Sequence, residues 1–339
     1  MGISANLAQN SQALSNAVAT PFTFRNRVIN GNCNLAQRTS LALANGVTGG
    51  YGGPDRFTAT NGGGGQFTQS QGSITYNGMT YNAVVQTVNT ANTTITGGSS
   101  WSGLQQRIEG YNCYDLLGEP VAMSFIFNTN VTGTYSVSLT DTATYSYVTT
   151  INAIANVPQK VVVTMPPVPL GASIPNSNAV GLYIRVGYLN TGTFQTSTLN
   201  TWIPGTFAAA TGATNWGLTA GNFIALTQLQ LEEGVEATPF ELRPASTEFS
   251  LCFRYYQTVF ASTRFAATAT TEYNDSTISW QTMRVAPTAA LLTAGTLSPT
   301  AASATMLSIQ PTGCRFEIVS NAAGDCYAVQ YYYSLSAEI

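Results

Sequence analysis

The sequence predicts an all-β protein, in which a jelly-roll β-sandwich precedes a smaller antiparallel β-domain and a short helix stands at the N-terminus. Apolar and polar residues alternate with a period of two along most of the chain after Pro21, which is typical of strands that bury one face. Clusters of Gly, Pro and Asn separate the alternating stretches and indicate turns. Charged residues make up 8 % of the chain, against about 25 % in ordinary soluble proteins. We therefore divide the 339 residues into segments 1–24, 25–245 and 246–339.

Residues 1–20 are the one helical candidate. Apolar and small residues recur there in three- and four-residue steps, along the line Ile3, Leu7, Asn10, Leu14 and Ala17. The segment is too short to be stable alone, and Thr20-Pro21 ends it. A short bundle at a symmetry axis, or docking onto another protein, would explain the pattern. The alternative is a frayed N-terminal arm.

Four alternating stretches predict strands of the sandwich within segment 25–245. Their inward positions are Val121, Met123, Phe125 and Phe127; Tyr135, Val137 and Leu139; Val161, Val163 and Met165; and Val180, Leu182, Ile184, Val186 and Tyr188. A further strand is expected at 223–231, with Phe223, Ala225, Thr227, Leu229 and Leu231 on one face. Turn-rich stretches, including 49–54, separate the strands, and no repeat of fixed period points to a solenoid.

The stretch 232–256 predicts the passage between the two β-domains. Gly234 ends the strand, Pro239 and Pro244 bracket an extended connector, and a new strand is expected to begin at 251–256. Four strands are expected in the C-terminal domain, at 253–256, 277–281, 315–319 and 327–333. About 90 residues make a marginal core, so we expect oligomerisation to add buried surface. Aromatic rings on both faces of 331–333 suit an interface strand; a Tyr-rich strand with one solvated face is the alternative.

Several function classes are excluded by composition. The chain has no histidine, which removes the usual general base and the commonest zinc ligand. The net charge is −3 and no basic cluster occurs, so we expect no nucleic-acid partner. No segment approaches the ~20 apolar residues of a membrane span, and no secretory signal is visible, so synthesis in the cytosol is expected. The five cysteines have no metal-like spacing and should be buried free thiols; no metal or other cofactor is expected.

Carboxylate chemistry is what remains for an enzyme. Glu232, Glu233, Glu236 and Glu241 are close in sequence. Glycosidases need two carboxylates across a cleft, whereas these lie on one turn and its connector. We therefore expect structural hydrogen bonds to Arg243 or to the backbone, with a single cation site or catalysis as the alternatives.

One motif carries a resemblance to a known family. It runs Gln230-Leu231-Glu232-x-Gly234-x-x-Ala237-Thr238-Pro239-Phe240-Glu241-x-Arg243-Pro244, followed by Thr247-Glu248 and Cys252-x-Arg254-Tyr255-Tyr256. Weaker matches fall in the same order along the chain at 25–31, 37–38, 54–57, 106–110, 115–116, 283–288 and 336–339. The pattern resembles bacteriophage tail-fibre and related virion proteins, in which a jelly-roll like a carbohydrate-binding module precedes a small C-terminal β-domain. Cys33 and Asn34 depart from it.

Sugar-binding candidates are aromatic and polar residues on a sheet face or in loops. Tyr183 and Arg185 share the face opposite the aliphatic one, and Trp101, Trp202 and Trp216 lie in loops rich in small polar residues. The alternatives are that these tryptophans plug the sandwich ends and that Arg185 pairs with Glu109 or Asp115.

The resemblance implies a non-enzymatic phage virion protein, with the virion as its location. We expect a homotrimeric fibre or spike that contacts host surface glycans, and attachment to other virion proteins through Ile3, Leu7 and Leu14. The rival expectation is a decoration or adaptor protein that bridges virion proteins and binds no receptor. A depolymerising enzyme comes third.

Overall fold

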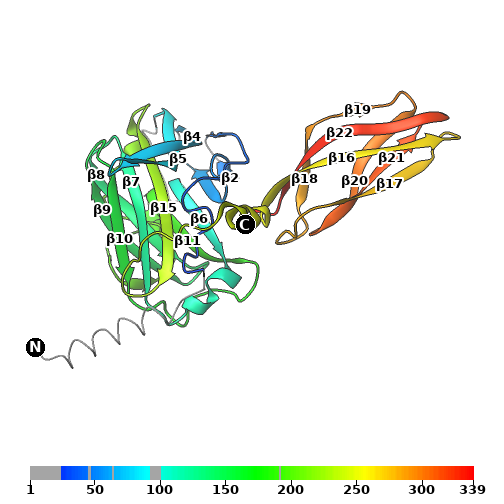
Figure 1. Ribbon diagram of the computed structural model, residues 1–339. Helices are drawn as coiled ribbons and strands as arrows, with labels where there is room; N and C mark the ends of the chain where they lie inside the picture. The colour runs from blue at the N-terminus through cyan, green and yellow to red at the C-terminus, as the bar shows by residue number, and fades with distance from the viewer. Residues whose placement is uncertain (1–23, 45–46, 63–64, 92–100, 191) are drawn as a thin grey trace, which may run out of the picture.

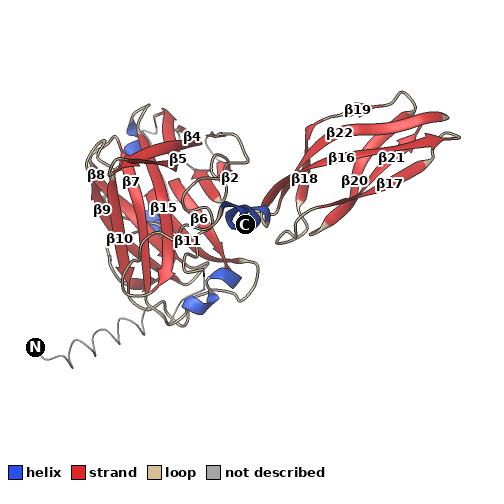
Figure 2. Ribbon diagram, in the orientation of Figure 1, coloured by secondary structure: helices blue, strands red, loops and turns tan. Residues whose placement is uncertain are grey.

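A computed structural model describes residues 24–44, 47–62, 65–91, 101–190 and 192–339. Two bodies are built from strands. The smaller body projects from one side of the larger, and one α-helix lies between them (Figures 1 and 2). The all-β fold expected from the alternating pattern is confirmed. The expected N-terminal helix, with Ile3, Leu7 and Leu14, falls outside the described residues.

The N-terminal body is a sandwich of two antiparallel sheets. One sheet has six strands, in the order β1 (Leu41–Leu43), β4 (Gln66–Tyr76), β5 (Met79–Thr90), β15 (Phe223–Glu233), β7 (Val121–Thr129) and β10 (Gln159–Met165). The other has seven, in the order β13 (Trp202–Pro204), β9 (Tyr145–Ala153), β8 (Gly133–Thr140), β11 (Val180–Asn190), β6 (Trp101–Glu109), β3 (Phe57–Asn61) and β2 (Val47–Tyr51). Neighbouring strands often come from distant parts of the chain, as in a jelly-roll. A parallel pair, β12 (Gln195–Thr196) with β14 (Ala209–Ala210), lies in the loop region that follows β11.

The two sheets bury one continuous apolar core between them. Phe125 and Phe127 of β7 face Leu182 and Ile184 of β11 across the sandwich, as the alternating pattern predicts. Trp216, in the 3-10 turn Trp216–Leu218, fills the same core. The sequence placed only a turn at 49–54, but β2 runs through its first half.

The predicted face of β15 is wrong for its first half. A bulge lies between Thr227 and Gln230, where Gln228 has a φ of 50°. Ile224 and Leu226 therefore face the main core before the bulge, and Leu229 and Leu231 face it afterwards. Phe223 and Ala225 join a separate cluster instead. The extra residue of the bulge is what shifted the alternation.

The expected strand at 251–256 is also wrong, because its first half is helix and the strand begins only at Tyr256. The helix α2 runs from Ala245 to Phe253, directly after Pro244. Its Cys252 is buried against Ile29, Leu35 and Tyr255, so the helix packs on the N-terminal sandwich. A short apolar run does not distinguish a buried strand from a buried helix, which explains the error.

The C-terminal body is a smaller sandwich of two sheets. One sheet contains β16 (Tyr256–Ala267), β22 (Gly324–Ser336), β18 (Thr288–Thr293) and β19 (Thr296–Leu297); the other contains β17 (Tyr273–Ser279), β21 (Gly313–Ser320) and β20 (Ala301–Gln310). These seven strands replace the four expected. Tyr331 and Tyr333 point inward onto Phe316, and Tyr332 points outward beside Phe260.

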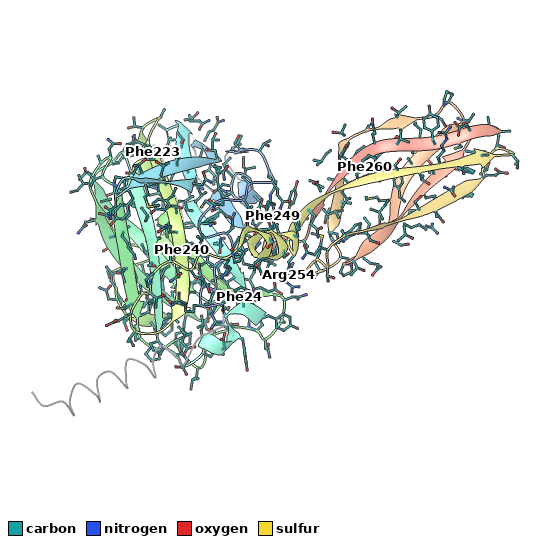
Figure 3. The ribbon with its side chains drawn as sticks, viewed as in Figure 1. Phe24, Phe223, Phe240, Phe249, Arg254 and Phe260 are labelled. Carbon is teal, nitrogen blue, oxygen red and sulfur yellow. The ribbon has the colours of Figure 1, made fainter. Side chains whose placement is uncertain are left out.

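The two sandwiches meet at a polar joint, formed by Arg56, Glu109, Arg254, Tyr255 and Glu338. The buried Glu109 carboxylate accepts hydrogen bonds from the Arg254 guanidinium and, at 2.6 Å, from the Tyr255 hydroxyl. Glu338 pairs with Arg56, whose guanidinium lies 3.5 Å from the Tyr255 ring centroid. Arg254 lies at the point where the chain enters the second body (Figure 3).

The five cysteines are buried free thiols, as predicted. The described residues contain no helix with the length and apolar character that a membrane crossing requires.

A candidate ligand pocket on the outer face of the seven-stranded sheet

The outer face of the seven-stranded sheet is polar because of simple alternation. Leu182, Ile184 and Val186 of β11 point into the core, so Tyr183 and Arg185 point outward. The neighbouring strand β6 is antiparallel and pairs Tyr183 with Arg107 and Arg185 with Gln105. The structure thus brings the predicted pair Tyr183 and Arg185 together and places a second arginine beside them.

A bulge adds Tyr188 to this face. Gly187 has a φ of 63°, and the register of β11 on β6 shifts between Val186 and Leu189. Tyr188 therefore turns away from the aliphatic face, on which the sequence had placed it. Its hydroxyl lies 2.8 Å from that of Thr60. Burial raises the pKa of Tyr188, although Arg185 lowers it.

Arg185 is held in place by neutral partners. Its Nε donates to Gln105 Oε1 at 2.9 Å, and its Nη1 donates to Thr140 Oγ1 at 2.7 Å. Its guanidinium lies 4.8 Å from the Tyr183 ring centroid and 5.5 Å from that of Tyr188. The sequence had offered Glu109 or Asp115 as ion-pair partners, but these pair with Arg254 and Arg27.

These side chains line an open pocket of about 270 Å³. The sheet supplies the floor, and its other wall comes from the segments after β8 and β11, with Thr142, Phe194, Thr206 and Ala208. The pocket combines tyrosine rings, two guanidinium groups, an amide and hydroxyls in one cavity. Such a cavity can stack a flat apolar face and donate several hydrogen bonds.

Outward-facing serines fix this wall to the sheet. The Ser138 hydroxyl of β8 donates to the Ala208 carbonyl at 3.0 Å. Ser146 of β9 donates to the Gly205 carbonyl at 2.6 Å and accepts from the Phe207 N–H at 2.8 Å. Because serine is short, the loop backbone lies directly on the strands. The loop wall of the pocket is therefore held directly against the sheet.

Neither Trp202 nor Trp216 joins the pocket. Trp216 is fully buried, packs edge-on against Phe67 and donates its indole N–H to the Gly187 carbonyl at 2.8 Å, so the prediction that it contacts a glycan is wrong. Trp202 lies on the edge strand β13, against Tyr147 and the core, and donates to the Pro166 carbonyl at 2.9 Å. The Trp101 side chain lies outside the described part of the structure.

Two of the four acidic residues near the connector, Glu232 and Glu241, have structural partners. Glu232 accepts hydrogen bonds from Gln230, from the Thr238 N–H at 2.7 Å and from the Thr238 hydroxyl at 2.6 Å. Glu241 accepts from the Asn26 N–H at 2.9 Å and pairs with Arg243. This is the structural hydrogen bonding that the sequence favoured for these two glutamates.

A second pocket, of about 410 Å³, lies beside Phe24, with Arg27, Tyr111 and Arg243 in its lining. Its wall includes the first described residue of the chain. The candidate site is the pocket on the sheet, because described strands and loops form it.

Arg107, Gln105, Tyr188 and Thr60 were missed by the sequence reasoning. Alternation along 104–108 places Arg107 opposite Leu104 and Ile108, but it does not tell which strand lies alongside. The signal for Tyr188 was Gly187, which interrupts the most regular strand of the chain.

No family model and no curated protein matches this sequence. Among solved structures, the fold is similar to an exo-β-agarase (TM-score 0.32, 8 % identity, 55 % of this chain and 24 % of that chain). It is also similar to the Stig cyclase Fisc from Fischerella sp. TAU, with a TM-score of 0.32 and 11 % identity over 63 % of this chain and 98 % of that chain. A third similar structure is an arabinose-bound α-L-arabinofuranosidase, with a TM-score of 0.30 and 12 % identity over 63 % of this chain and 31 % of that chain. The chain spans about a quarter of the agarase's length. At these TM-scores the likenesses do not inform function.

Proposed function

We propose that this chain is a non-enzymatic structural component of a phage virion, a trimeric tail fibre or spike, and that its sheet pocket contacts a glycan on the host surface. The observation that supports the glycan contact is the Tyr183–Arg185–Tyr188 cluster. The resemblance of the 230–256 motif to virion fibre proteins supports the proposed location in a phage virion.

The chemistry of the pocket suits a sugar. Tyrosine rings stack on the C–H face of a pyranose, and planar side chains such as those of Gln105 and Arg185 match its hydroxyl groups. A volume of about 270 Å³ is at the small end of ligand pockets, which suits one or two sugar residues. Affinity would then be modest, and several copies on one fibre would add avidity.

The arrangement of carboxylates favours binding over hydrolysis. Glycosidases place two carboxylates about 5–10 Å apart around the scissile bond. The described residues that line the pocket include no Asp or Glu. The nearby Glu109 is engaged in the joint with Arg254 and Tyr255.

A second candidate function is an adaptor that binds other virion proteins and no receptor. The feature that favours it is the outward face of β16 and β22. The ring centroids of Phe260 and Tyr332 lie 5.4 Å apart there, and the two side chains are 49 % and 45 % exposed. Such a face suits a protein contact.

Adsorption to host cells separates the two. Labelled protein should bind host cells and block infection, and Tyr183→Ala should weaken adsorption by about 5- to 30-fold, which corresponds to on the order of 1–2 kcal/mol for one stacked ring. Tyr273→Ala is the matched control, because Tyr273 is 61 % exposed on the other body. If the wild-type protein neither adsorbs nor blocks infection, the adaptor function takes precedence.

A further inference from the structure

The arginines of the sheet pocket differ from most others in this protein. Seven arginines of the described chain form ion pairs with carboxylates: Arg27, Arg38, Arg56, Arg243, Arg254, Arg264 and Arg315. Arg107 and Arg185 form none, although both lie in the pocket. The hydrogen bonds of Arg185 go to an amide and a hydroxyl, neither of which carries charge.

Both cations also lie against the same tyrosine ring. The Arg107 and Arg185 guanidinium groups lie 5.8 Å and 4.8 Å from the same Tyr183 ring centroid. Arg107 Nε is buried and has no hydrogen-bond partner among the described residues. Burial lowers the pKa of Arg185, and the charge of Arg107 lowers it further, whereas the tyrosines raise it. Two like charges in a partly desolvated pocket are unfavourable until a counter-charge arrives.

The carboxylate of Asp141, near the pocket, is already occupied. Asp141 follows β8, beside Thr140, and its oxygens accept the backbone N–H groups of Ala143, Thr144 and Tyr145 at 2.7–3.0 Å and that of Ser173 at 2.6 Å. We therefore expect the counter-charge to come from the ligand.

We propose that the sheet pocket recognises a sugar that bears an anionic substituent, a carboxylate, sulfate or phosphate, with Arg107 and Arg185 as the charge-recognising residues. The planar guanidinium fork matches all three groups. Tyr183 and Tyr188 contact the sugar ring while the arginines bind the anionic group, so the site recognises both parts of the ligand. This inference rests on the glycan-binding function proposed above and narrows its substrate class.

Direct binding measurements test this. Glucuronate, glucose 6-sulfate and glucose 6-phosphate should each be titrated by NMR into the full chain, beside glucose and inorganic phosphate. At least one charged sugar should bind about tenfold or more tightly than glucose and than inorganic phosphate. Which of the three binds best identifies the anionic group. Equal binding of glucose overturns the anionic class, and equal binding of inorganic phosphate overturns the sugar.

Variants assign the residues. Arg107→Gln should weaken the best charged sugar about 10- to 100-fold and leave glucose binding unchanged. Arg264→Gln is the control, because that side chain is 68 % exposed on the other body. Since Arg185 also braces the strands, Arg185→Lys is used beside Arg185→Gln, with the melting temperature as a check on folding. Unchanged affinity in Arg107→Gln and in a folded Arg185→Gln overturns the assignment, whereas Arg185→Lys, which keeps the charge, should retain part of the affinity.

Failure of the proposed function gives a different result. If charged sugars bind and the protein still does not adsorb to host cells, the pocket assignment holds and the receptor-binding role fails. If Arg107→Gln adsorbs normally and a neutral glycan blocks adsorption, the receptor-binding role holds and the anionic class fails.

Discussion

Single side chains decide which aromatic residues are available for binding. Trp216 and Trp202 were equal candidates in the sequence, since both follow loops of small polar residues. Their environments differ because Trp216 lies under the sheet, hydrogen-bonded to Gly187, while Trp202 lies at the edge strand. A pattern of loop residues carries no information on which way the loop folds back. The sequence offered plugging of the sandwich ends as an alternative for these tryptophans, but it could not tell which ring is buried.

The two tryptophans should differ in their contribution to stability. Trp216→Ala removes a fully buried side chain and should lower the free energy of unfolding by about 3–5 kcal/mol. Trp202→Ala should lower it by clearly less, because part of that ring is already exposed. Denaturant unfolding followed by circular dichroism measures both. A Trp216→Ala protein as stable as the wild type would show that the ring does not fill the core.

At the scale of elements, bulges and one helix account for most differences from the sequence-based prediction. The strands β7, β8 and β10 follow simple alternation, and their inward residues were predicted correctly. β11 and β15 each contain a bulge, at Gly187 and Gln228, and the predicted face is wrong after the bulge in β11 and before the bulge in β15. The residues of the resemblance motifs, such as Arg56, Glu109 and Glu338, meet at the joint. The sequence could not predict that these residues meet, because they lie far apart along the chain.

The β8–β9 turn gives a pH-dependent prediction. Burial alone would raise the pKa of Asp141, but hydrogen bonds from the Thr144 hydroxyl and from four backbone N–H groups, those of Ala143, Thr144, Tyr145 and Ser173, outweigh it and lower that pKa below its usual value. Asp141 therefore stabilises the fold above its unfolded pKa of about 3.9. This contribution is lost as the pH falls through the lower folded pKa.

Asp141→Asn should thus unfold more easily than the wild type at pH 7, by about 1–3 kcal/mol. The difference should shrink as the pH falls below about 4, because the wild-type carboxyl becomes protonated. Melting curves from pH 7 to pH 2 measure it, with Asp325→Asn, at an exposed ion pair, as the control. A difference that stays constant over this range would mean that the Asp141 charge is not responsible.

At the scale of the whole molecule, the smaller sandwich presents an apolar face. Phe260 and Tyr332 lie side by side on it, and Leu292 of the neighbouring strand β18 is 56 % exposed. Figure 3 places Phe260 on the second body, beyond the joint. The aromatic residues on both faces of 331–333 were read from the sequence as an interface strand, and the outward Tyr332 keeps that prediction open.

We expect a homotrimer that uses this face. Light scattering of the purified protein should report about three chains, and Phe260→Ser should shift the protein toward monomers because it removes a large apolar contact. Leu170→Ser is the control, since Leu170 is 81 % exposed on the other body. A wild-type monomer at micromolar concentration would exclude the trimer, and a trimeric Phe260→Ser protein would place the interface elsewhere.

The joint also has a mechanical consequence. β16 leaves it at Tyr256 and β22 returns to it at Ser336, so that the two paired strands start at one end and reach Ala267 and Gly324 together at the other. The C-terminus of the chain lies beside the helix α2, at the joint (Figure 1). A tensile load between the far tip and the first sandwich would be shared by both strands in the same direction. Such a load neither shears nor unzips the hydrogen bonds between β16 and β22 while both strands are held at the joint. The continuous chain holds β16 there, and the ion pairs of Glu338 with Arg38 and Arg56 hold the end of β22.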